Sequence, residues 1–397
     1  MRPDLTATRA AAVLVGAALA LAGTTPALAA EATGPIQHAG SPSAIAGSYL
    51  VVLKPGAEAD RQRAGRLTQR YGGAVTRVFG HAIEGYTARL SARQAARLAA
   101  DPAVASVEAD QAVHIAATQP NAPWGLDRVD QRNLPLSTTY TYGPSSGVTV
   151  YIIDTGITVT HQDFGGRARY GYDAVDGDNV AQDGNGHGTF VAGVAAGSTY
   201  GIAKGANVVG VRVLDNNGSG TTAGVIAGID WVTANAARGS SVANLSLGGG
   251  ASTTLDAAVR RSISAGIPYA IAAGNSGVNA ANTSPARVTE ALTVGATSRT
   301  DARASWSNFG AVLDLFAPGV DITSDWRTSN TATYTGSGTS FSSPHVAGAA
   351  ALYLAAHPGA SVTTVNSAVV AAATTGVVTN PGSGSPNRLL YTTTLSS

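Results

Sequence analysis

An aspartate, a histidine, a serine and an asparagine, far apart in the sequence, each stand at a turn where a side chain could take part in a reaction. The first, Asp154, follows the apolar run 149–153 and precedes Thr155 and Gly156. A carboxylate at the end of a strand is held by a rigid element and can orient a basic partner. The same residue could be an ordinary turn aspartate, and Asp-Thr-Gly is also the signature of aspartic peptidases, so this position alone decides nothing.

The histidine is His187, which has Gly186 before it and Gly188 after it. These glycines let the backbone approach a neighbour closely, and a run of small residues typical of a packed helix follows. Histidine is the side chain whose ordinary pKa suits proton transfer near neutral pH. A lone histidine is usually structural, but none of the other six has comparable glycine framing, so the sequence favours a functional role here.

The serine is Ser340, which follows a glycine turn at 336–338 and precedes Pro344. Proline is tolerated near the first turn of a helix, so the pattern predicts that a helix begins here. Free N–H groups and the positive end of the helix dipole would favour a developing oxyanion. Serine is also a common N-cap, which is the simpler interpretation. Ser342 breaks the G-x-S-x-G pattern, which argues against an α/β-hydrolase esterase or lipase.

The asparagine is Asn275, which follows the apolar run 268–272 and Gly274. Its amide N–H could donate to an oxyanion, although a turn asparagine is the plain alternative. An acid, a base, a hydroxyl and an amide donor therefore stand at the ends of predicted strands or the starts of predicted helices. Together they predict nucleophilic acyl transfer with the order Asp154, His187, Ser340, which is the order of the subtilisin triad.

The elements that must position these residues lie beyond residue 148. Apolar runs predict strands at 148–153, 208–213, 242–247, 268–272 and 292–294, and small-residue runs predict helices near 187–196, 222–237, 254–265 and 343–356. Continuous apolar strands joined by helices indicate an α/β fold, a mostly parallel twisted sheet with helices on both faces. Sites in such folds lie at the carboxyl ends of the strands.

A second, smaller domain is expected before it. The patterning predicts, in order, a strand at 49–53, a helix at 58–71, strands at 74–79 and 86–90, a helix at 92–100 and a strand at 104–108. The β-α-β-β-α-β order is that of a split-βαβ α+β domain.

The first 30 residues have the organisation of a secretory signal. Arg2 and Arg9 precede an apolar run at 10–22, and Ala27-Leu28-Ala29 follows as a small-residue cleavage site. The run is too short to span a bilayer. We therefore expect a secreted, extracellular protein with no membrane segment and a signal peptide at 1–29.

Composition excludes several classes of protein. Charged residues make up 12% of the 397 residues, against roughly 25% in an average globular protein, and the net charge is +1. A disordered polyelectrolyte is excluded, and a nucleic-acid partner is not expected. Because cysteine is absent, disulfides, thiolate nucleophiles and Cys-ligated metals are impossible, whereas metals bound by hard oxygen ligands remain possible.

The motifs resemble a known family. Asp154-Thr155-Gly156, Gly186-His187-Gly188-Thr189, Ala273-Gly274-Asn275 and Gly338-Thr339-Ser340 resemble the four signature regions of subtilisin-type serine peptidases. Segments 124–127, 244–250 and 385–390 resemble the proteinase K branch, close to aqualysin-like secreted enzymes. The resemblance implies a propeptide at 30–116, with its folded inhibitory part at about 49–110, and a peptidase domain at 117–397.

The resemblance also implies roles for single residues. Ser340 would be the nucleophile, His187 the general base and then acid, Asp154 the carboxylate that orients His187, and Asn275 an oxyanion donor beside the Ser340 N–H. Substrate would lie as an extended strand between two segments of the enzyme, and the residues implied to bind it are Gly218, Ser219, Gly220, Ser246, Leu247, Gly248, Ala272 and Gly274. Nothing acidic lies near these positions, so an apolar or small residue is expected before the scissile bond.

Calcium is the cofactor that the resemblance implies. Asp314, with the carbonyls of Thr289 and Ala291, matches one structural site, and a second would comprise Asp127, Asp130 and Gln131. Carboxylates and carbonyls are the ligands that calcium prefers. The alternative is that these aspartates are turn and cap residues.

The chain departs from the family pattern in three ways. Phe341, followed by Ser342, stands where methionine and alanine are common, and Phe190 stands where histidine is common. Phe341 is bulkier than methionine and could reshape the primary pocket. The four positions at which relatives have cysteine are here Gly184, Asn216, Ala281 and Val312.

The sequence argues against two other functions. An aspartic peptidase needs two aspartates that share a proton, and no second Asp-Thr-Gly or Asp-Ser-Gly occurs. A non-catalytic binding module would be favoured by loss of a triad residue, and none is lost. We therefore expect a monomeric enzyme whose partners are protein and peptide substrates and its own propeptide, which acts as an intramolecular inhibitor and folding aid.

Overall fold

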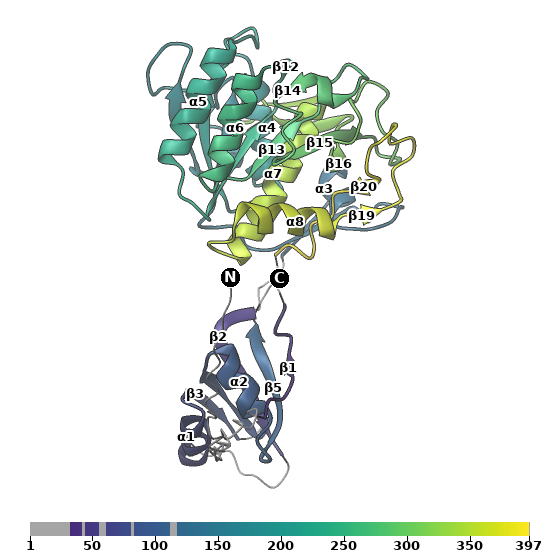
Figure 1. Ribbon diagram of the computed structural model, residues 1–397. Coiled ribbons are helices and arrows are strands. Elements are labelled where there is room, and N and C mark those ends of the chain that lie inside the picture. Colours follow the sequence, from purple (N-terminus) through teal and green to yellow (C-terminus); the bar gives the residue numbers. More distant parts are fainter. Residues whose placement is uncertain (1–31, 42–43, 55–60, 81–82, 112–116, 397) are drawn as a thin grey trace, which may run out of the picture. The chain divides into compact units, whose positions relative to one another are not determined.

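The computed structural model describes residues 32–41, 44–54, 61–80, 83–111 and 117–396, which fall into two compact units (Figure 1). One unit comprises Met1–Gln37 and Gly47–Ala109, and the other comprises His38–Ala46 and Asp110–Ser397. The predicted signal peptide at 1–29 lies outside the described residues. Within the described part of the chain, no helix combines the length and apolar character needed to cross a membrane.

The first unit contains the predicted β-α-β-β-α-β order. Its elements are β2 (Ala44–Leu53), α1 (Arg61–Arg70), β3 (Ala74–Phe79), β4 (Gly85–Arg89), α2 (Ala92–Ala99) and β5 (Val104–Gln111). A short strand that was not predicted, β1 (Ile36–Gln37), pairs in parallel with β5, so the sheet order is β1-β5-β2-β4-β3. Helix α2 begins with a capping box between Ser91 and Gln94, which satisfies two backbone N–H groups at its start.

The second unit is built on a sheet of nine strands, with the order β19-β20-β16-β15-β13-β11-β8-β10-β9. The strands are β8 (Thr149–Asp154), β9 (Ala168–Asp173), β10 (Asn207–Arg212), β11 (Ser241–Leu245), β13 (Tyr269–Ala272), β15 (Leu292–Thr297), β16 (Leu315–Pro318), β19 (Thr374–Thr375) and β20 (Arg388–Leu389). All neighbouring strands are parallel except β19 and β20. The predicted α/β class with a mostly parallel sheet is confirmed.

Both faces of this sheet are covered, as the continuous apolar strands predicted. In β8, Val150 and Ile152 join one core cluster, and Tyr151 and Ile153 join the other. The first cluster is shared with α4 (His187–Ala196), α7 (Thr339–Ala356) and α8 (Val362–Ala372). The second is shared with α5 (Thr222–Asn235) and α6 (Thr253–Ser264), so the sheet separates two sets of helices (Figure 1).

Strand β8 lies where the strand order reverses. The chain leaves it toward β9 and β10 on one side and later returns to β11 on the other side. In open parallel sheets, this reversal leaves a crevice at the carboxyl ends of the strands. The last residue of β8 is Asp154, so the topology places this carboxylate at the crevice.

Helix α7 begins earlier than predicted. It was expected at 343–356, but the structure starts it at Thr339, which places Ser340 in the first turn. Serine and threonine have low helix propensity, but a first turn needs no intrahelical N–H partners. Pro344 lies in the second turn, where its missing N–H leaves the Ser340 carbonyl without its usual helical partner. The helix is buried around most of its surface. A side chain at Gly348 would place its Cβ 2.7 Å from the Ala195 carbonyl of α4, so the two helices can pack this closely only with glycine here.

Asp325 and Asp163 form a buried carboxyl pair beneath α4. Asp325 ends β17 (Ile322–Asp325) and is fully buried, and neither of its oxygens accepts a hydrogen bond from a described residue. His161 Nδ1 lies 3.5 Å from Asp325 Oδ1. Burial, followed by the charge and hydrogen bonding of Asp163, raises the pKa of Asp325 from 3.8 to about 9. Asp325 therefore keeps its proton at neutral pH.

Replacing Asp325 by asparagine should stabilise the protein above pH 4. Between pH 4 and about 9 the unfolded chain releases the Asp325 proton and the folded chain retains it, so the stability of the natural protein falls over this range. Asp325→Asn has no proton to lose, and its free energy of unfolding at pH 8 should exceed that of the natural protein by on the order of 1–3 kcal/mol. Urea denaturation at pH 4, 6 and 8 measures the difference.

The matched control is Asp230→Asn, which makes the same change of charge on the exposed side of α5. It should leave the pH dependence of unfolding unchanged. Parallel stability curves for Asp325→Asn and the natural protein would show that the pair holds no proton at neutral pH.

Candidate active site

Asp154 and His187, the first two residues singled out in the sequence, lie in direct contact. Asp154 is fully buried, and its Oδ1 accepts hydrogen bonds from the Thr155 N–H at 2.7 Å and from His187 Nδ1 at 2.8 Å. Because a carboxylate only accepts, the Nδ1 atom carries the proton and Nε2 keeps a free lone pair. The pair therefore presents a basic nitrogen.

The close approach of the start of α4 to the Trp326 ring depends on Gly186, which precedes His187. Gly186 has φ +119°, a left-handed conformation that favours glycine, and a Cβ there would lie 2.5 Å from the Trp326 ring. The glycine framing seen in the sequence thus has a steric cause.

The environment of His187 favours its charged form. Burial lowers the pKa of His187, but the charge and hydrogen bond of Asp154, together with the charge of Asp183, more than offset this and raise the pKa above 6.5. A quarter of the His187 side chain remains exposed. The imidazole can therefore reach a ligand, and the protein stabilises the imidazolium that would form when it takes a proton.

Ser340 lies in the first turn of α7 and is tied to Ser246. The Ser340 hydroxyl donates to the Ser246 carbonyl at 3.1 Å, and the Ser246 hydroxyl donates to the Ser340 carbonyl at 2.6 Å. Pro344 explains why that carbonyl is available, because proline lacks the N–H that would bond to the carbonyl four residues before it. Among the described hydrogen bonds, the Ser340 hydroxyl has none to His187, so it must rotate before it can transfer a proton.

Asn275 is held with its amide N–H₂ facing Ser340. Its Oδ1 accepts from the Thr339 N–H at 2.9 Å and from the Thr339 hydroxyl at 2.7 Å, so Nδ2 must point the other way. A Cβ at Gly338 would lie 3.6 Å from Asn275 Nδ2 and 3.7 Å from Ser340 N. Two N–H donors therefore flank one point beside Ser340, an arrangement suited to binding an oxyanion.

Two supporting residues were not identified from the sequence. The sequence indicated Thr339 only as a member of a motif, although this residue fixes the Asn275 amide. Asn308 holds the turn that carries Asn275, because its Nδ2 donates to the Ala273 carbonyl at 2.8 Å and its Oδ1 accepts from the Ser276 N–H at 3.1 Å. No sequence signal pointed to Asn308, since its partners lie about 30 positions away.

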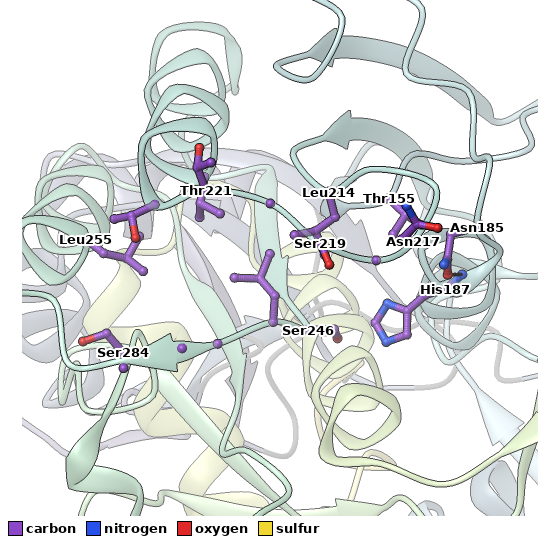
Figure 2. Close-up of a pocket in the computed structure, with 18 residues that line it drawn as sticks. Thr155, Asn185, His187, Leu214, Asn217, Ser219, Thr221, Ser246, Leu255 and Ser284 are labelled. Atoms are coloured by element: carbon purple, nitrogen blue, oxygen red, sulfur yellow. Dashed lines mark hydrogen bonds between the residues drawn. The ribbon is translucent and has the colours of Figure 1, made fainter.

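The residues expected to bind substrate line two neighbouring cavities. The first has a volume of about 560 Å³, and its lining includes His187 and the predicted residues Gly218, Ser219, Gly220, Ser246, Leu247 and Gly248. Figure 2 shows His187 near Asn185 and Ser219 at one end of this cavity, with Leu255 and Ser284 at the opposite end. The second, of about 360 Å³, is lined by residues that include Ala272, Gly274, Asn275 and Ser340. Among the described lining residues of both cavities there is no Asp, Glu, Lys or Arg.

The two aromatic departures from the family pattern form one contact. The rings of Phe190 and Phe341 have centroids 4.0 Å apart, and the Phe341 centroid lies 5.7 Å from that of His187. Phe341 is not among the described residues that line either cavity. It packs behind His187 against α4, so its bulk supports the imidazole rather than narrowing the pocket.

Gly184 and Asn216, two of the four positions at which the resemblance implied cysteine, lie close together. A Cβ on Gly184 would lie 1.9 Å from Asn216 Oδ1, so the two segments already approach as closely as a side chain allows. The Asn185 amide donates to the Asn216 carbonyl at 3.0 Å, and Arg212 donates to Asn216 Oδ1 at 3.1 Å. Hydrogen bonds therefore join the segment before His187 to the segment that lines the first cavity.

The first predicted calcium site contains the carboxylate of Asp314. Asp314 Oδ2 accepts a hydrogen bond from the Thr293 N–H at 2.8 Å, so the carboxylate lies beside the start of β15. Thr289 and Ala291 come shortly before this strand in the sequence. Burial raises the pKa of Asp314 to about 6. Asp314 is half-buried, and carboxylate and carbonyl oxygens are the ligands that a hard cation prefers, so the chemistry of the predicted ligands suits calcium.

The second predicted site fits less well. Asp127 accepts from the Ser137 and Thr138 N–H groups, and Gln131 Oε1 accepts from the same Ser137 N–H. These atoms act as caps of a turn. Asp130 keeps one buried oxygen without a hydrogen-bond partner, and burial raises its pKa to about 6. Within the described residues, no group of three or more His, Asp or Glu side chains is arranged to hold a metal ion.

Comparison with known proteins agrees with this geometry. Residues 145–389 match the model of the subtilase family, and residues 48–116 match that of the peptidase inhibitor I9 family. An extracellular serine proteinase from a Thermus species is 50% identical over 388 residues, which cover 92% of this chain and 94% of that protein. Alkaline serine exoprotease A from Vibrio alginolyticus is 50% identical over 341 residues, which cover 84% and 63% of the two chains.

A solved structure agrees as well. The crystal structure of a cold-adapted subtilisin-like serine proteinase is 52% identical in sequence, covers 68% of this chain and 98% of its own, and superposes with a TM-score of 0.67. Both the fold and the sequence of the second unit are therefore shared with proteolytic enzymes, and the chain belongs to the subtilase family of serine peptidases, with an I9 inhibitor domain preceding its peptidase domain.

Proposed function

We propose that this chain is the precursor of a secreted serine endopeptidase that acts through an acyl-enzyme intermediate, with Ser340 as nucleophile. The observation that carries the proposal is the 2.8 Å hydrogen bond from His187 Nδ1 to the buried Asp154, which leaves Nε2 free to accept a proton. The paired N–H donors of Asn275 and Ser340 support it, because they would bind the oxyanion of acyl transfer.

The reaction follows from these groups. The Ser340 hydroxyl turns from Ser246 and attacks the substrate carbonyl while its proton moves to His187 Nε2. Asp154 stabilises the imidazolium, and the carbonyl oxygen, now negative, accepts from Asn275 Nδ2 and the Ser340 N–H. His187 then protonates the leaving amine. In the second half of the reaction His187 takes a proton from water while the water oxygen attacks the ester carbonyl, and it returns that proton to Ser340 Oγ as the ester C–O bond breaks and the acid product leaves.

The cavities suggest the substrate class. An extended peptide would lie between segments 218–220 and 246–248, and the side chain before the scissile bond would enter the cavity of about 360 Å³ that Ala272 and Gly274 line. A cavity of this size without charged lining residues favours apolar or small side chains and offers no partner for lysine or arginine. We propose broad cleavage with that preference.

The precursor organisation is proposed from the two family matches. Residues 1–29 would be the signal, 30–116 the propeptide and 117–397 the peptidase, since the I9 match ends at residue 116. Ala117 begins β6 (Ala117–Pro120), which pairs with β7 (Thr139–Tyr142). Secretion agrees with the name of the extracellular Thermus relative. The propeptide would aid folding of the parallel sheet and inhibit the monomeric enzyme until it is cut.

We also propose structural calcium. Asp314 with the carbonyls of Thr289 and Ala291 would hold one ion, and Asp130 with Asp127 and Gln131 would hold a second, in which the unpartnered Asp130 oxygen would gain a ligand. Calcium would stabilise the fold in a chain that has no cysteine.

Fluorophosphonate treatment tests the nucleophile. The secreted natural protein should be modified on Ser340 in a chain that starts near Ala117, and mass spectrometry of the modified peptide and of the N-terminus measures both. Ser340→Ala should accumulate uncut precursor, because it lacks the group that would make the first cut. A folded, processed chain that takes no label would support the binding-module alternative.

Thr339→Val should lower kcat for peptide hydrolysis by about tenfold with little change in KM. The variant loses the hydroxyl that donates to Asn275 Oδ1 at 2.7 Å, so the amide can rotate away from the oxyanion. Thr339→Ser keeps the hydroxyl and is the matched control. Equal kcat values for the valine and serine variants would show that Thr339 does not orient the amide.

Calcium removal should lower the thermal unfolding midpoint of the natural protein, and Asp314→Asn should abolish part of that effect. Because the pKa of Asp314 is about 6 without metal, protons should compete with calcium, and the stabilisation by calcium should shrink as pH falls through 6. Calorimetry with calcium and with EDTA at pH 5 and 8 measures this. An Asp314→Asn variant with a full calcium response would exclude this site.

A further inference from the structure

Asp183 is a buried carboxylate close to His187 that the mechanism above does not use. It lies four residues before His187 and is 3% exposed. Its Oδ1 accepts hydrogen bonds from the Asn185 N–H at 2.9 Å, the Gly186 N–H at 2.7 Å and the Thr155 hydroxyl at 2.9 Å. Its Oδ2 accepts from the Thr189 N–H at 2.9 Å and from the Thr189 hydroxyl at 2.6 Å.

These donors belong to two different elements. Thr155 is in the turn after β8, directly after Asp154, whereas Gly186 and Thr189 are at the start of α4, on either side of His187. Thr155 joins the two further, because its N–H donates to Asp154 and its hydroxyl accepts from the Gly188 N–H at 2.9 Å. A Cβ on Gly188 would lie 2.1 Å from the Gly156 carbonyl, so this contact is close.

Among the described residues, no cation pairs with Asp183. All its hydrogen-bond donors are uncharged, and the described residues include no ion pair to it. Arg327 approaches the same loop, but its Nε donates to the Asn185 carbonyl. The other titratable groups on elements packed against α4 are Tyr151 and Asp154 of β8, Arg212 of β10, His161 and Asp163 at the 3-10 helix 162–164, Asp325 of β17, and His345 and Tyr353 of α7. Arg212 is paired with Asp173 and Asp176.

We infer that Asp183 is a positioning residue of the catalytic pair: its carboxylate holds the Asp154 turn and the start of α4 in one register, and its unneutralised charge stabilises the imidazolium that forms on His187 during acylation. The inference rests on the proposed function, because it assigns His187 as the base. A simple loop-stabilising role for Asp183 would change folding without changing the basicity of His187.

The test measures the rate constant for modification of Ser340 by diisopropyl fluorophosphate between pH 5 and 9, in the mature full chain. Asp183→Asn has the same shape but no charge. Its amide N–H₂ must face at least one backbone N–H, so the variant also loses at least one hydrogen bond. The rate constant on the plateau should fall by about tenfold or more, and the midpoint of the acid limb should move to lower pH by roughly half a unit or more. Histidine NMR in a Ser340→Ala background should show the same shift in the titration of His187.

The matched control for loss of a buried carboxylate is Asp256→Asn. Asp256 lies on α6 and is 2% exposed, and its Oδ2 lies 2.6 Å from Arg287 Nε. This variant should unfold more easily than the natural protein, while the midpoint of its acid limb stays in place.

Thr189 separates geometry from charge and covers the case in which Asp183→Asn does not fold. Thr189→Val removes one donor to Asp183 but keeps the carboxylate, so the rate constant should fall several-fold with no movement of the acid limb. Thr189→Ser keeps the hydroxyl and should restore the rate.

The outcomes distinguish this inference from the proposed function. If the natural protein itself takes no label, the proposed nucleophile is wrong. If the natural protein reacts and Asp183→Asn reacts at the same rate with the same pH profile, Asp183 has no positioning role. Equal rates for the valine and serine variants of Thr189 would overturn the geometric part.

Discussion

Burying a carboxylate is costly unless hydrogen-bond donors and a partner that can become positive lie beside it, and Asp154 imposes this requirement on the peptidase unit. The end of β8 supplies the carboxylate, the turn at Thr155 supplies an N–H, and the start of α4 supplies the imidazole. Parallel strands bring these groups to one edge of the sheet, since their carboxyl ends all meet there. The reversal of strand order beside β8 keeps that edge open to a ligand.

Close backbone packing lets helices reach this edge. Gly188 lets α4 start against the turn that follows β8, and Gly348 lets α7 lie against α4. Gly186 lets the residue before His187 lie against the Trp326 ring. Pro344 then frees the Ser340 carbonyl for Ser246, so the nucleophile is tied to a segment that lines the substrate cavity. The site is thus fixed by backbone contacts that larger side chains would prevent.

The sequence was informative wherever a residue has a strong local signature. Buried parallel strands have continuous apolar runs, so five strands of the large sheet were predicted from their composition, and glycines marked the loop at His187. Short or polar strands such as β9 and β16 lack this signature and were missed. Helix α8 was also missed, although Ser361 caps its start and could have indicated it.

Local patterns could not show which distant residues meet. Asn308 and Thr339 hold Asn275 through hydrogen bonds across about 30 and 64 positions. Phe190 and Phe341 were noted as separate departures, and only the fold shows that they are one contact. Family resemblance supplied the predicted metal ligands, and local patterns could not show their hydrogen-bond partners: Asp314 accepts from the Thr293 N–H, and Asp127 accepts from the Ser137 N–H.

The central claim is that Asp154 fixes the tautomer of His187, so that Nε2 is the base. The most direct measurement is ¹⁵N and ¹H NMR of the Ser340→Ala protein labelled on histidine, at a pH above the pKa of His187. The account predicts a proton on Nδ1, hydrogen-bonded to Asp154, and an unprotonated Nε2. A neutral imidazole with its proton on Nε2 would contradict it, because that nitrogen could not accept the proton of the nucleophile.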